Sequence, residues 1–317
     1  MSEAEDLYRK LLTGDRRSAA RLISMVEDGE EGASEALQAL HKHSGRAHIV
    51  GFTGSPGSGK STLACRLAQE YRKRGKSVGI ICVDPTSPFT GGALLGDRVR
   101  MQELAGDPEV FIRSKGSRGA LGGLAVAIND VINILDAFGK DYIIVETVGA
   151  GQVEIEVVKY AHTCIVVTMP GAGDEIQAIK AGILEIGDVF VVNKADRDGA
   201  MRTLADLEMM VETKPGGIQA WKPPVVATVA LEGDGVDLLA GEIARHYDFL
   251  TESGTLTRKI VGRRKAEVLA ILSLKVSEAA SRALEDGGVA AALVERMVAR
   301  ELDPHGAAAE LAEEMDL

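Results

Sequence analysis

Cysteine and aromatic residues are scarce in this chain of 317 residues. It has only three cysteines, Cys65, Cys82 and Cys164, and aromatic residues make up 4% of the sequence. The cysteines lie far apart and fall in stretches expected to form helix or strand, so neither a disulfide nor a thiolate metal site is expected. We interpret them as small buried residues of a protein in a reducing compartment. The core must therefore be built mainly from Val, Ile, Leu and Ala.

Long apolar runs and an excess of positive charge are also missing. No stretch approaches the roughly 18 consecutive apolar residues of a membrane span, and the start, MSEAEDLYRK, lacks the apolar core of a signal peptide. We therefore expect a cytoplasmic protein with no membrane partner. Lys and Arg number 36 against 47 Asp and Glu, which gives a net charge of -11. That charge disfavours non-specific binding to nucleic acid.

A glycine-rich loop lies between an apolar run and a helix-compatible run. The apolar run is HIVGFT (48–53), the loop is GSPGSGKST (54–62), and the helix-compatible run is Thr62 to Arg74. This context turns a match to GxxxxGK[ST] into a predicted phosphate site, because backbone N–H groups and the helix N-terminus favour an anion. Lys60 is expected to reach the β- and γ-phosphates, and the Ser61 hydroxyl to bind the Mg²⁺ that bridges them. The residues expected to contact the nucleotide here are Gly54, Ser55, Pro56, Gly57, Ser58, Gly59, Lys60, Ser61 and Thr62.

Apolar runs typical of strands alternate with helical runs over residues 46–248. Several are almost continuous Val and Ile, which suits strands covered on both faces by helices. The alternation predicts an α/β fold with a doubly wound, mostly parallel sheet, as in a P-loop GTPase. Ligands of such sheets bind at the carboxyl ends of the strands. The expected strands are 47–53, 77–83, 110–113, 142–146, 163–169, 188–193 and 224–228.

Helical segments flank this region. The N-terminal one carries Leu, Ile and Val at helical spacing and must pack on the next domain or on a partner. The C-terminal one begins with a long apolar-striped helix from Thr255 to Leu284, followed by a second helix from Val289 to Leu302. Such a stripe is either intramolecular cover or an arm for another subunit, and we favour a homodimer. The expected domains are a helical extension (1–45), a P-loop GTPase domain (46–248) and a helical dimerisation arm (249–317).

The sequence NKAD (193–196) follows an apolar strand and predicts the choice of nucleotide. The Asp196 carboxylate can accept hydrogen bonds from the N1–H and the 2-amino group of guanine, whereas adenine would leave it desolvated and unpaired. Lys194 can lie along the base, and Asn193 can tie this loop to the phosphate loop. The residues expected to offer a backbone N–H to the guanine carbonyl are Thr228, Val229 and Ala230.

The motif ETVGAGQVE (146–154) follows the strand DYIIV. An acid that closes a strand beside a phosphate loop usually holds Mg²⁺ through water, and Glu146 is assigned that role. Gly149 can approach the γ-phosphate through its backbone N–H, and the glycines allow movement between triphosphate and diphosphate states. Gln152 either orients the attacking water or belongs to a plain surface loop.

The stretch VDPTSPFTGGALLGDRVRM (83–101) is rich in Pro and Gly and predicts a mobile loop that magnesium and phosphate can order. Asp84 is the preferred group for positioning or activating the water and a candidate metal ligand, and Asp97 is a second candidate near the metal. The segment MPGAGDEIQAIKAGI (169–183) is either a third movable loop or a plain strand-to-helix connection. Arginines that can contact phosphate, but are more often solvated or structural, are Arg98, Arg100, Arg113 and Arg118.

Together these motifs resemble one family of P-loop GTPases. It is the group of cobalamin-enzyme G-protein chaperones that includes bacterial MeaB, the human methylmalonic aciduria type A protein and the older ArgK label. The likeness covers nearly the whole chain and is most specific in ETVGAGQ and in the DPTSPF–GDRVRM stretch. Val229 stands where relatives tend to have serine, a change that a backbone contact would survive. The segments that carry the resemblance are 54–62, 83–101, 146–154, 169–183 and 193–196.

The resemblance implies a homodimer that slowly hydrolyses GTP to GDP and phosphate. It also implies a complex with adenosylcobalamin-dependent methylmalonyl-CoA mutase, in which GTP binding and hydrolysis gate cofactor loading and protect the mutase from inactivation. The segments around 84–101, 149–156 and 169–180 would couple the nucleotide to that partner. The residues by themselves predict only a magnesium-dependent GTPase with switch loops.

Three other functions fit the sequence less well. A nickel-insertion maturation GTPase needs Cys and His ligands, but the only His cluster is His41 and His43 with His48 nearby, and no cysteine is close. Histidines two positions apart do not share a helix face. A small-molecule or protein kinase would need an acceptor pocket, for which the sequence has no motif. A pure interaction protein with a vestigial site is disfavoured by the intact phosphate and guanine motifs.

Overall fold

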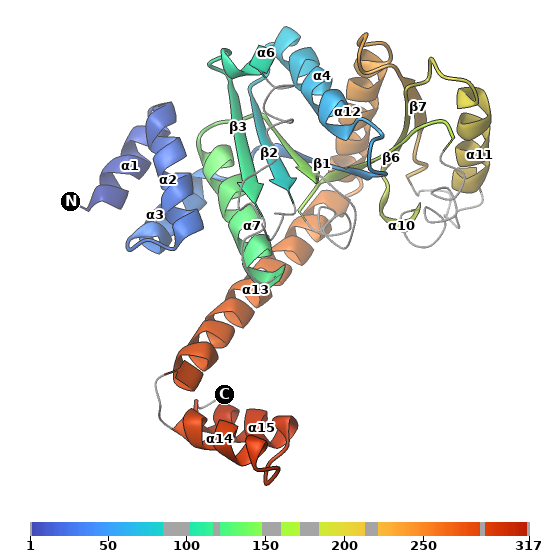
Figure 1. The fold of residues 1–317 in the computed structure, drawn as a ribbon. Coiled ribbons are helices and arrows are strands. Elements are labelled where there is room, and N and C mark those ends of the chain that lie inside the picture. Colours follow the sequence, from blue (N-terminus) through green and yellow to red (C-terminus); the bar gives the residue numbers. More distant parts are fainter. Residues whose placement is uncertain are drawn as a thin grey trace. The chain divides into compact units, whose positions relative to one another are not determined.

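The computed structural model describes residues 2–84, 102–116, 121–147, 160–171, 184–212, 221–285 and 289–315. By its contacts the chain divides into two compact units, Met1–Lys265 and Ala266–Leu317 (Figure 1). The strands are β1 (His48–Gly54), β2 (Val78–Asp84), β3 (Val110–Gly116), β4 (Tyr142–Thr147), β5 (Thr163–Thr168), β6 (Val189–Asn193) and β7 (Val225–Thr228). The helices of the first unit are α1 (Glu3–Leu12), α2 (Arg16–Asp28), α3 (Ala33–Leu40), the 3₁₀ turn η1 (His41–His43), α4 (Lys60–Lys73), α6 (Gln102–Ala105), α7 (Leu121–Ala137), α10 (Leu184–Ile186), α11 (Ala200–Glu212) and α12 (Val236–Glu252). The remaining helices are α13 (Thr255–Glu285), which crosses the boundary between the units, α14 (Val289–Val298) and α15 (Pro304–Glu314).

The strands form one parallel sheet in the order β3-β2-β4-β1-β5-β6-β7. All six strand pairings described are parallel, and each predicted strand is present within a few residues of its expected bounds. The strands are dominated by buried Val and Ile, because helices cover both faces and leave no face for polar side chains. The predicted α/β fold with a parallel sheet is therefore confirmed.

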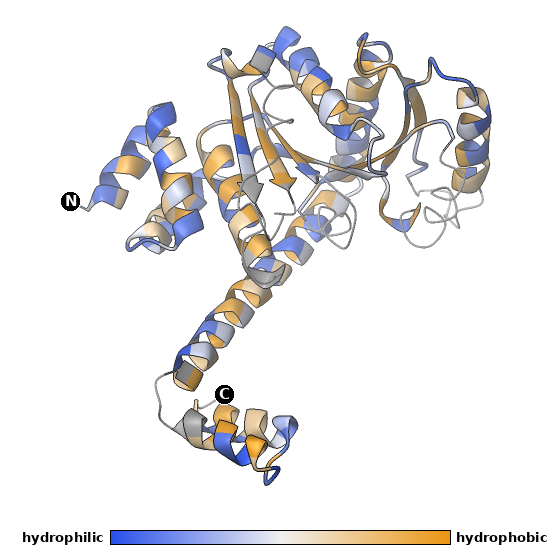
Figure 2. Cartoon of the chain, viewed as in Figure 1, coloured by the Kyte–Doolittle hydropathy of each residue, from blue (hydrophilic) through white to orange (hydrophobic). Residues whose placement is uncertain are grey.

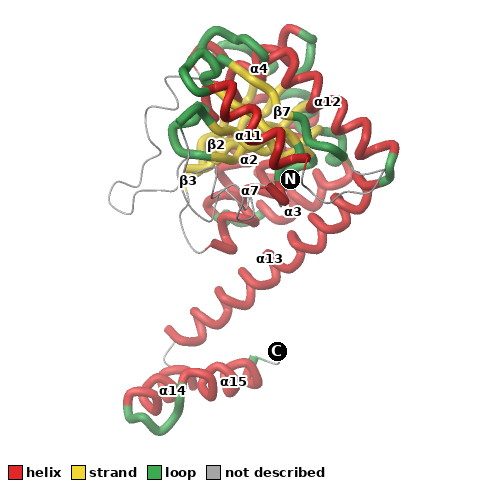
Figure 3. The backbone as a smooth tube through the Cα atoms, turned by 90° about the vertical axis from the view of Figure 1, so that its right-hand side faces the viewer, coloured by secondary structure: helices red, strands yellow, loops and turns green. Residues whose placement is uncertain are grey.

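Two helical layers sandwich the sheet (Figure 3). Helices α4 and α12 cover one face, where Leu63, Leu67 and Ile243 pack against the strands. Helix α7 covers the other face, and α1 to α3 pack on the far side of α7. No helix among the described residues is long and apolar enough to cross a membrane.

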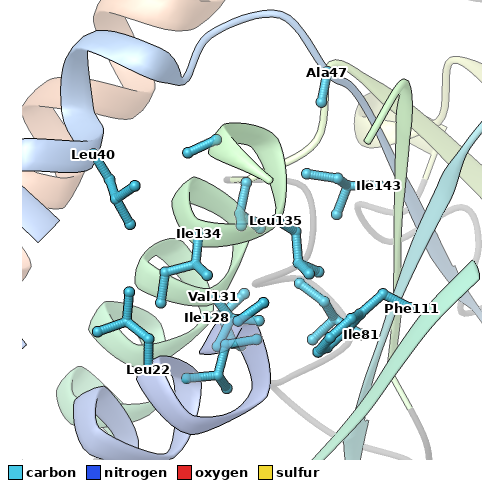
Figure 4. Close-up of a cluster of buried hydrophobic side chains, with 14 of the residues drawn as sticks. Leu22, Leu40, Ala47, Ile81, Phe111, Ile128, Val131, Ile134, Leu135 and Ile143 are labelled. Atoms are coloured by element: carbon cyan, nitrogen blue, oxygen red, sulfur yellow. The ribbon is translucent and has the colours of Figure 1, made fainter. Parts of the chain in front are cut away.

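Helix α7 packs against the N-terminal helices on one face and against the strands on another (Figure 4). Its side chains Ile128 and Ile134 lie toward the N-terminal helices, where Leu22 and Leu40 are buried, while Leu135 lies toward the strands. The N-terminal helices thus share one hydrophobic core with the sheet. This decides between the two predicted locations of the extension, because it packs on the next domain of the same chain.

The link between the N-terminal helices and β1 is held by one carboxylate. Asp136, near the end of α7, is buried and accepts backbone hydrogen bonds from Gly45 at 2.5 Å, Arg46 at 3.1 Å and Ala47 at 3.0 Å. A carboxylate that accepts several N–H groups compensates its own burial and fixes the chain that donates them. Asp136 therefore sets where β1 begins.

The first turns of α13 are tied to the first unit. Lys259 Nζ donates to the carbonyl of His162 at 2.9 Å and lies 3.1 Å from Asp188 Oδ2. Arg263 and Arg264 donate to the side-chain oxygens of two asparagines on α7 at 3.3 and 3.2 Å. The first turns of α13 thus belong to the first unit, and the chain leaves that unit only after Lys265.

In the second unit, α14 and α15 form a helical pair. Leu293 is buried between them, and Arg296 of α14 pairs with Glu310 of α15 at 2.7 Å. The sequence predicted a helix as far as Leu302, but α14 ends at Val298. Arg300 adopts the left-handed conformation with φ 61°, which turns the chain so that the next N–H bonds back to the carbonyl of Arg296.

The cysteines have the predicted surroundings. All three are buried and unbridged. Burial raises the pKa of the Cys65 thiol to about 11 and places the pKa of Cys164 well above its ordinary range. Thiols that stay protonated in this way serve as small apolar residues of the core.

Candidate nucleotide-binding site

The predicted phosphate loop connects the carboxyl end of β1 to the start of α4. Gly54, Gly57 and Gly59 have positive φ values of 126°, 74° and 91°, a conformation that glycine adopts without steric cost. A Cβ on Gly54 would collide with the carbonyl oxygen of Val167 in β5, and one on Gly59 would collide with the Asn193 amide. The loop can therefore follow this path only with glycine at both positions.

Lys60 lies inside the loop. Its side chain is buried, and Nζ donates to the carbonyl oxygens of Gly54 and Ser55, the latter at 3.1 Å. These carbonyls hold the ammonium group within the curve of the loop that precedes α4. A phosphate bound in this curve would meet a positive charge that is already in place. Pro56 and Gly57 are exposed at the tip of the loop, and Thr62 is half-buried on α4.

The Ser58 hydroxyl of this loop is buried and, among the described residues, makes no hydrogen bond. Buried polar groups are almost always paired in folded proteins. An unsatisfied hydroxyl inside an anion-binding loop fits a site whose remaining partner is a ligand oxygen.

Ser61 faces Glu146, the predicted acid at the carboxyl end of β4. The Ser61 hydroxyl donates to Glu146 Oε1, and the carboxylate is fully buried beside Phe52 of β1 and Cys82 of β2. A hydroxyl and a carboxylate are hard oxygen donors of the kind that Mg²⁺ prefers. Among the described residues no group of three or more His, Cys, Asp and Glu could hold a metal.

The other predicted metal and switch residues are only partly described. Asp84 is the last residue of β2, at the same edge of the sheet as Glu146, but its side chain lies outside the described atoms. The predicted residues that lie outside the described ranges are Asp97, Arg98, Arg100, Arg118, Gly149 and Gln152, together with most of segments 84–101, 149–156 and 169–180.

Arg113, offered as a phosphate contact, serves the fold instead. It projects from β3 toward α2, where its guanidinium donates to the Glu27 carboxylate and to Ser24 Oγ at 3.1 Å. This ion pair ties the N-terminal helices to the edge of the sheet. The structural interpretation of this arginine is the correct one.

Asn193 connects three loops at the carboxyl edge. Its Nδ2 donates to the carbonyl of Ser58 at 2.7 Å, and its Oδ1 accepts from Thr228 Oγ1 at 3.1 Å and from the Ala230 N–H at 3.0 Å. All three hydrogen bonds of this buried amide have donor–acceptor distances in the normal range. The phosphate loop and the loop after β7 are thereby held at fixed positions relative to the NKAD segment.

Lys194 and Asp196 follow Asn193 in this loop. Lys194 has a positive φ of 57°, and its Nζ donates to the carbonyl of Gly57 at 2.6 Å and contacts Met169 Sδ at 3.5 Å. Its stem therefore runs from the NKAD loop toward the tip of the phosphate loop. Asp196 is exposed to solvent in the turn that follows. Its carboxylate is therefore accessible to a ligand.

The loop after β7 has its backbone donors turned inward. The Val229 N–H bonds the Asp234 carbonyl at 3.0 Å, and the Ala230 N–H bonds Asn193 Oδ1. Of these two, only the Ala230 N–H donates to the NKAD loop. Sequence reasoning missed Arg66 of α4, which donates to the carbonyls of Ala230 and Leu231 at 3.1 and 2.9 Å. No local pattern marks Arg66, because its partners lie 164 and 165 residues away.

The histidines do not form a metal site among the described residues. His41 and His43 are exposed or half-exposed in η1, and His48 is buried at the start of β1, where Nε2 lies 2.8 Å from Thr163 Oγ1. That edge of the sheet is opposite the phosphate loop, since it holds the amino ends of the strands. The ligand set that a nickel-insertion protein needs is therefore not found in the described part of the chain.

The chain was compared with known proteins. A family model described as Methylmalonyl Co-A mutase-associated GTPase MeaB matches residues 19–285. The chain belongs to the MeaB family. A Pyrococcus horikoshii relative, named as a GTPase, is 48% identical over 313 residues, which is 97% of this chain and 97% of the relative. The mitochondrial methylmalonic aciduria type A homolog of Caenorhabditis elegans is 33% identical over 273 residues, which is 80% of this chain and 68% of the relative.

The fold of this MeaB-family chain also matches a solved structure. A crystal structure of LAO/AO transport system kinase covers 100% of this chain and 99% of its own, with a TM-score of 0.73 and 25% identity. The family match and the GTPase relatives establish that the chain is a P-loop GTPase, which binds a guanine nucleotide and hydrolyses GTP. The predictions of this family and of GTPase activity are confirmed.

Proposed function

We propose that this MeaB-family GTPase is a magnesium-dependent G-protein chaperone of adenosylcobalamin-dependent methylmalonyl-CoA mutase. In this proposal, GTP binding and hydrolysis gate the loading of the cofactor into the mutase and protect the mutase from inactivation. The observation that carries the proposal is the match of residues 19–285 to a family named for its association with that mutase. The C. elegans relative, named for methylmalonic aciduria, supports the same partner.

The phosphate site would work through groups that are already in position. Lys60 would bind the β- and γ-phosphates from inside the loop, and Ser61 and Glu146 would hold Mg²⁺. When bound, Mg²⁺ supplies positive charge that offsets the charge developing on the phosphates. Asp84 and Gln152 are the candidates for positioning the attacking water, with the Gly149 N–H at the γ-phosphate.

The guanine site would be formed by the loops that Asn193 joins. Asp196 would accept hydrogen bonds from N1–H and the 2-amino group, Lys194 would lie along the base, and the loop Thr228–Ala230 would donate to the carbonyl group. Adenine offers neither donor to Asp196 and would leave its carboxylate unpaired. A site that requires a hydrogen bond rejects a base lacking the donor more strongly than an apolar pocket does.

We also propose that the protein is a homodimer formed through α13. Several large apolar side chains are exposed along this helix, whose apolar residues are coloured orange in Figure 2. They are Ile260, Val261, Val268, Leu269 and Leu272. Burial of such a stripe against a second copy would remove apolar surface from water at roughly 25 cal/mol per Å². A reducing, cytoplasmic setting is part of the proposal because the three cysteines are unbridged.

The test is to measure GTP turnover with and without a purified adenosylcobalamin-dependent methylmalonyl-CoA mutase, with ATP as the control substrate. We expect slow turnover of GTP alone, which rises when the mutase is added. Turnover indifferent to the mutase would leave the GTPase but remove the proposed partner. A preference for ATP, or phosphate transfer to a small acceptor, would overturn the guanine assignment and favour a kinase.

A further inference from the structure

Arg66 joins the helix that follows the phosphate loop to the loop that follows β7. It lies on α4, and its side chain is 34% exposed. Nε donates to the Ala230 carbonyl at 3.1 Å and Nη2 to the Leu231 carbonyl at 2.9 Å. The rigid guanidinium therefore spans two consecutive carbonyl groups, which is a geometry that lysine cannot reproduce.

Two neighbours orient this guanidinium. Gln69, one turn along α4, accepts from Arg66 Nη1 at 2.9 Å. Glu103 of α6 lies 3.7 Å from the same nitrogen and accepts from Gln69 Nε2 at 2.9 Å. The guanidinium is thus held by Nη1 on α4 and α6, while Nε and Nη2 contact the loop after β7.

Ala230 is consequently held at both of its backbone groups. Its N–H bonds Asn193 Oδ1 at 3.0 Å, and its carbonyl bonds Arg66. Peptide groups are planar, so restraints on either side of a residue fix its two backbone dihedral angles. The turn that follows is closed by its own bonds, in which the N–H groups of Glu232 and Gly233 donate to the Val229 carbonyl. Arg66 is the contact that anchors this turn to α4.

We propose that Arg66 is a positioning residue for guanine recognition. By fixing the peptide groups on both sides of Ala230, it holds the Ala230 N–H, which donates to Asn193 Oδ1, at a place where the oxygen at position 6 of the base can share the same donor. This inference rests on the guanine site assigned above. A donor fixed in advance discriminates between acceptors better than one that can move to suit each ligand. Arg66 itself touches no part of the base in this arrangement.

The test uses two analogues that change different edges of guanine. The 6-thio analogue of GDP replaces the oxygen at position 6 with a poorer hydrogen-bond acceptor. Inosine diphosphate keeps that oxygen but lacks the 2-amino group, which is assigned to Asp196. Affinities for GDP and both analogues are measured by calorimetry on the full chain, for the wild type and for Arg66→Ala.

We expect Arg66→Ala to lower the ratio of GDP affinity to 6-thio-GDP affinity by about threefold to tenfold, the range for one hydrogen bond. The ratio of GDP affinity to inosine diphosphate affinity should stay at its wild-type value. In turnover assays KM for GTP should rise while kcat changes little, because the loop does not contact the phosphates. Arg66→Lys should give an intermediate ratio, since one ammonium group can reach only one of the two carbonyls.

The matched control is Arg74→Ala. Arg74 directly follows the last residue of the same helix and donates to a backbone carbonyl of α12, that of Asp237, at 3.2 Å. The Arg74→Ala substitution should leave both affinity ratios unchanged, although it removes a similar link between the end of α4 and a neighbouring segment. If Arg66→Ala fails to fold, Arg66→Lys provides the same comparison.

Two outcomes would overturn the proposal. An unchanged 6-thio ratio in Arg66→Ala would show that the arginine does not set the donor. A parallel fall of both ratios would show general loosening of the site. A wild-type protein with no preference for guanine over adenine nucleotides would instead reject the guanine site itself, so the two failures are distinguishable.

Discussion

Ser61 and Glu146, which are 85 residues apart in sequence, share a hydrogen bond at the carboxyl edge of the sheet. The pair joins the first turn of α4 to the end of β4. The carboxylate is fully buried, and a buried negative charge favours a cation held beside it. In the proposed site, Ser61 and Glu146 would hold a divalent cation.

Glu146→Gln should therefore remove the effect of Mg²⁺ on nucleotide binding. The amide keeps the volume and a hydrogen bond to Ser61 but loses the negative charge. We expect GDP affinity in Mg²⁺ to fall to the value in EDTA, and GTP turnover to fall by about 100-fold, as for other groups that stabilise transition-state charge. Calorimetry with and without EDTA checks this, with the exposed Glu212→Gln as the control. A variant that still responds to Mg²⁺ would remove Glu146 from the metal site.

Asp196→Asn should relax the preference for guanine. The amide keeps one acceptor oxygen, for N1–H, but turns an N–H donor toward the 2-amino group, which loses its acceptor at a cost of about 2–4 kcal/mol in GDP affinity. The new amide N–H suits a carbonyl at position 2, so xanthosine diphosphate should bind better to the variant than to the wild type. The control is Asp198→Asn, which is exposed two residues further along the same loop. An unchanged ratio of GDP to ADP affinity would reject the assignment.

Much of this architecture could be predicted from local sequence. Buried parallel strands require near-continuous Val and Ile, so runs such as IIV at 143–145 and CIVV at 164–167 located β4 and β5. The phosphate loop and NKAD are contiguous motifs that need only their flanking elements to be identified. The end of α14 was harder to predict, because a non-glycine residue, Arg300, takes the left-handed conformation that closes it.

The contacts that connect distant segments could not be predicted. Asp136 and Arg66 have no motif, since each is defined by backbone groups far away in sequence. The order of the strands and the packing of the N-terminal helices on α7 likewise depend on which faces meet. A charged residue such as Arg113 looks the same in sequence whether it meets a phosphate or a carboxylate.

Asp136→Ala should destabilise the fold without changing the nucleotide site. It leaves the N–H groups of residues 45–47 without the acceptor that they share. We expect the free energy of unfolding to fall by about 2–4 kcal/mol, since hydrogen bonds to a charged group are lost in a buried place. Urea denaturation gives this value, with the exposed Asp248→Ala as control. Equal stability of both variants would show that the cluster contributes little.

Stability should decrease at mildly acidic pH because of the buried histidines. Burial lowers the pKa of His162 to about 3 and that of His246 to about 4, whereas in the unfolded chain both have the ordinary value near 6.5. Between these values the unfolded chain binds more protons than the folded one, so stability falls as the pH drops from about 7 toward 4. Each histidine should cost about 2 kcal/mol at pH 5 relative to pH 8.

Urea denaturation across this pH range tests the prediction. His41→Gln and His305→Gln change histidines that are exposed and should leave the slope of stability against pH as in the wild type. A stability that stays constant down to pH 5 would show that both buried rings titrate normally in the folded protein.

A chain that ends at Lys265 should be a monomer that still binds GDP. It keeps Lys259, Arg263 and Arg264, which tie the root of α13 to the GTPase unit, and loses the rest of the exposed stripe. A chain that ends at Gly254 should bind GDP but unfold more easily, because those contacts are gone. Light scattering gives the oligomeric state. A dimer in the chain that ends at Lys265 would place the interface elsewhere.

The three bonds of the Asn193 amide have a consequence for the order of events when nucleotide leaves. This amide positions the phosphate loop through Ser58 and the loop after β7 through Ala230. In the proposed nucleotide site, opening of the loop after β7 would withdraw support from the phosphate loop, and dissociation would become one concerted step rather than two successive ones. A partner protein that displaced either loop would accelerate exchange of the whole nucleotide.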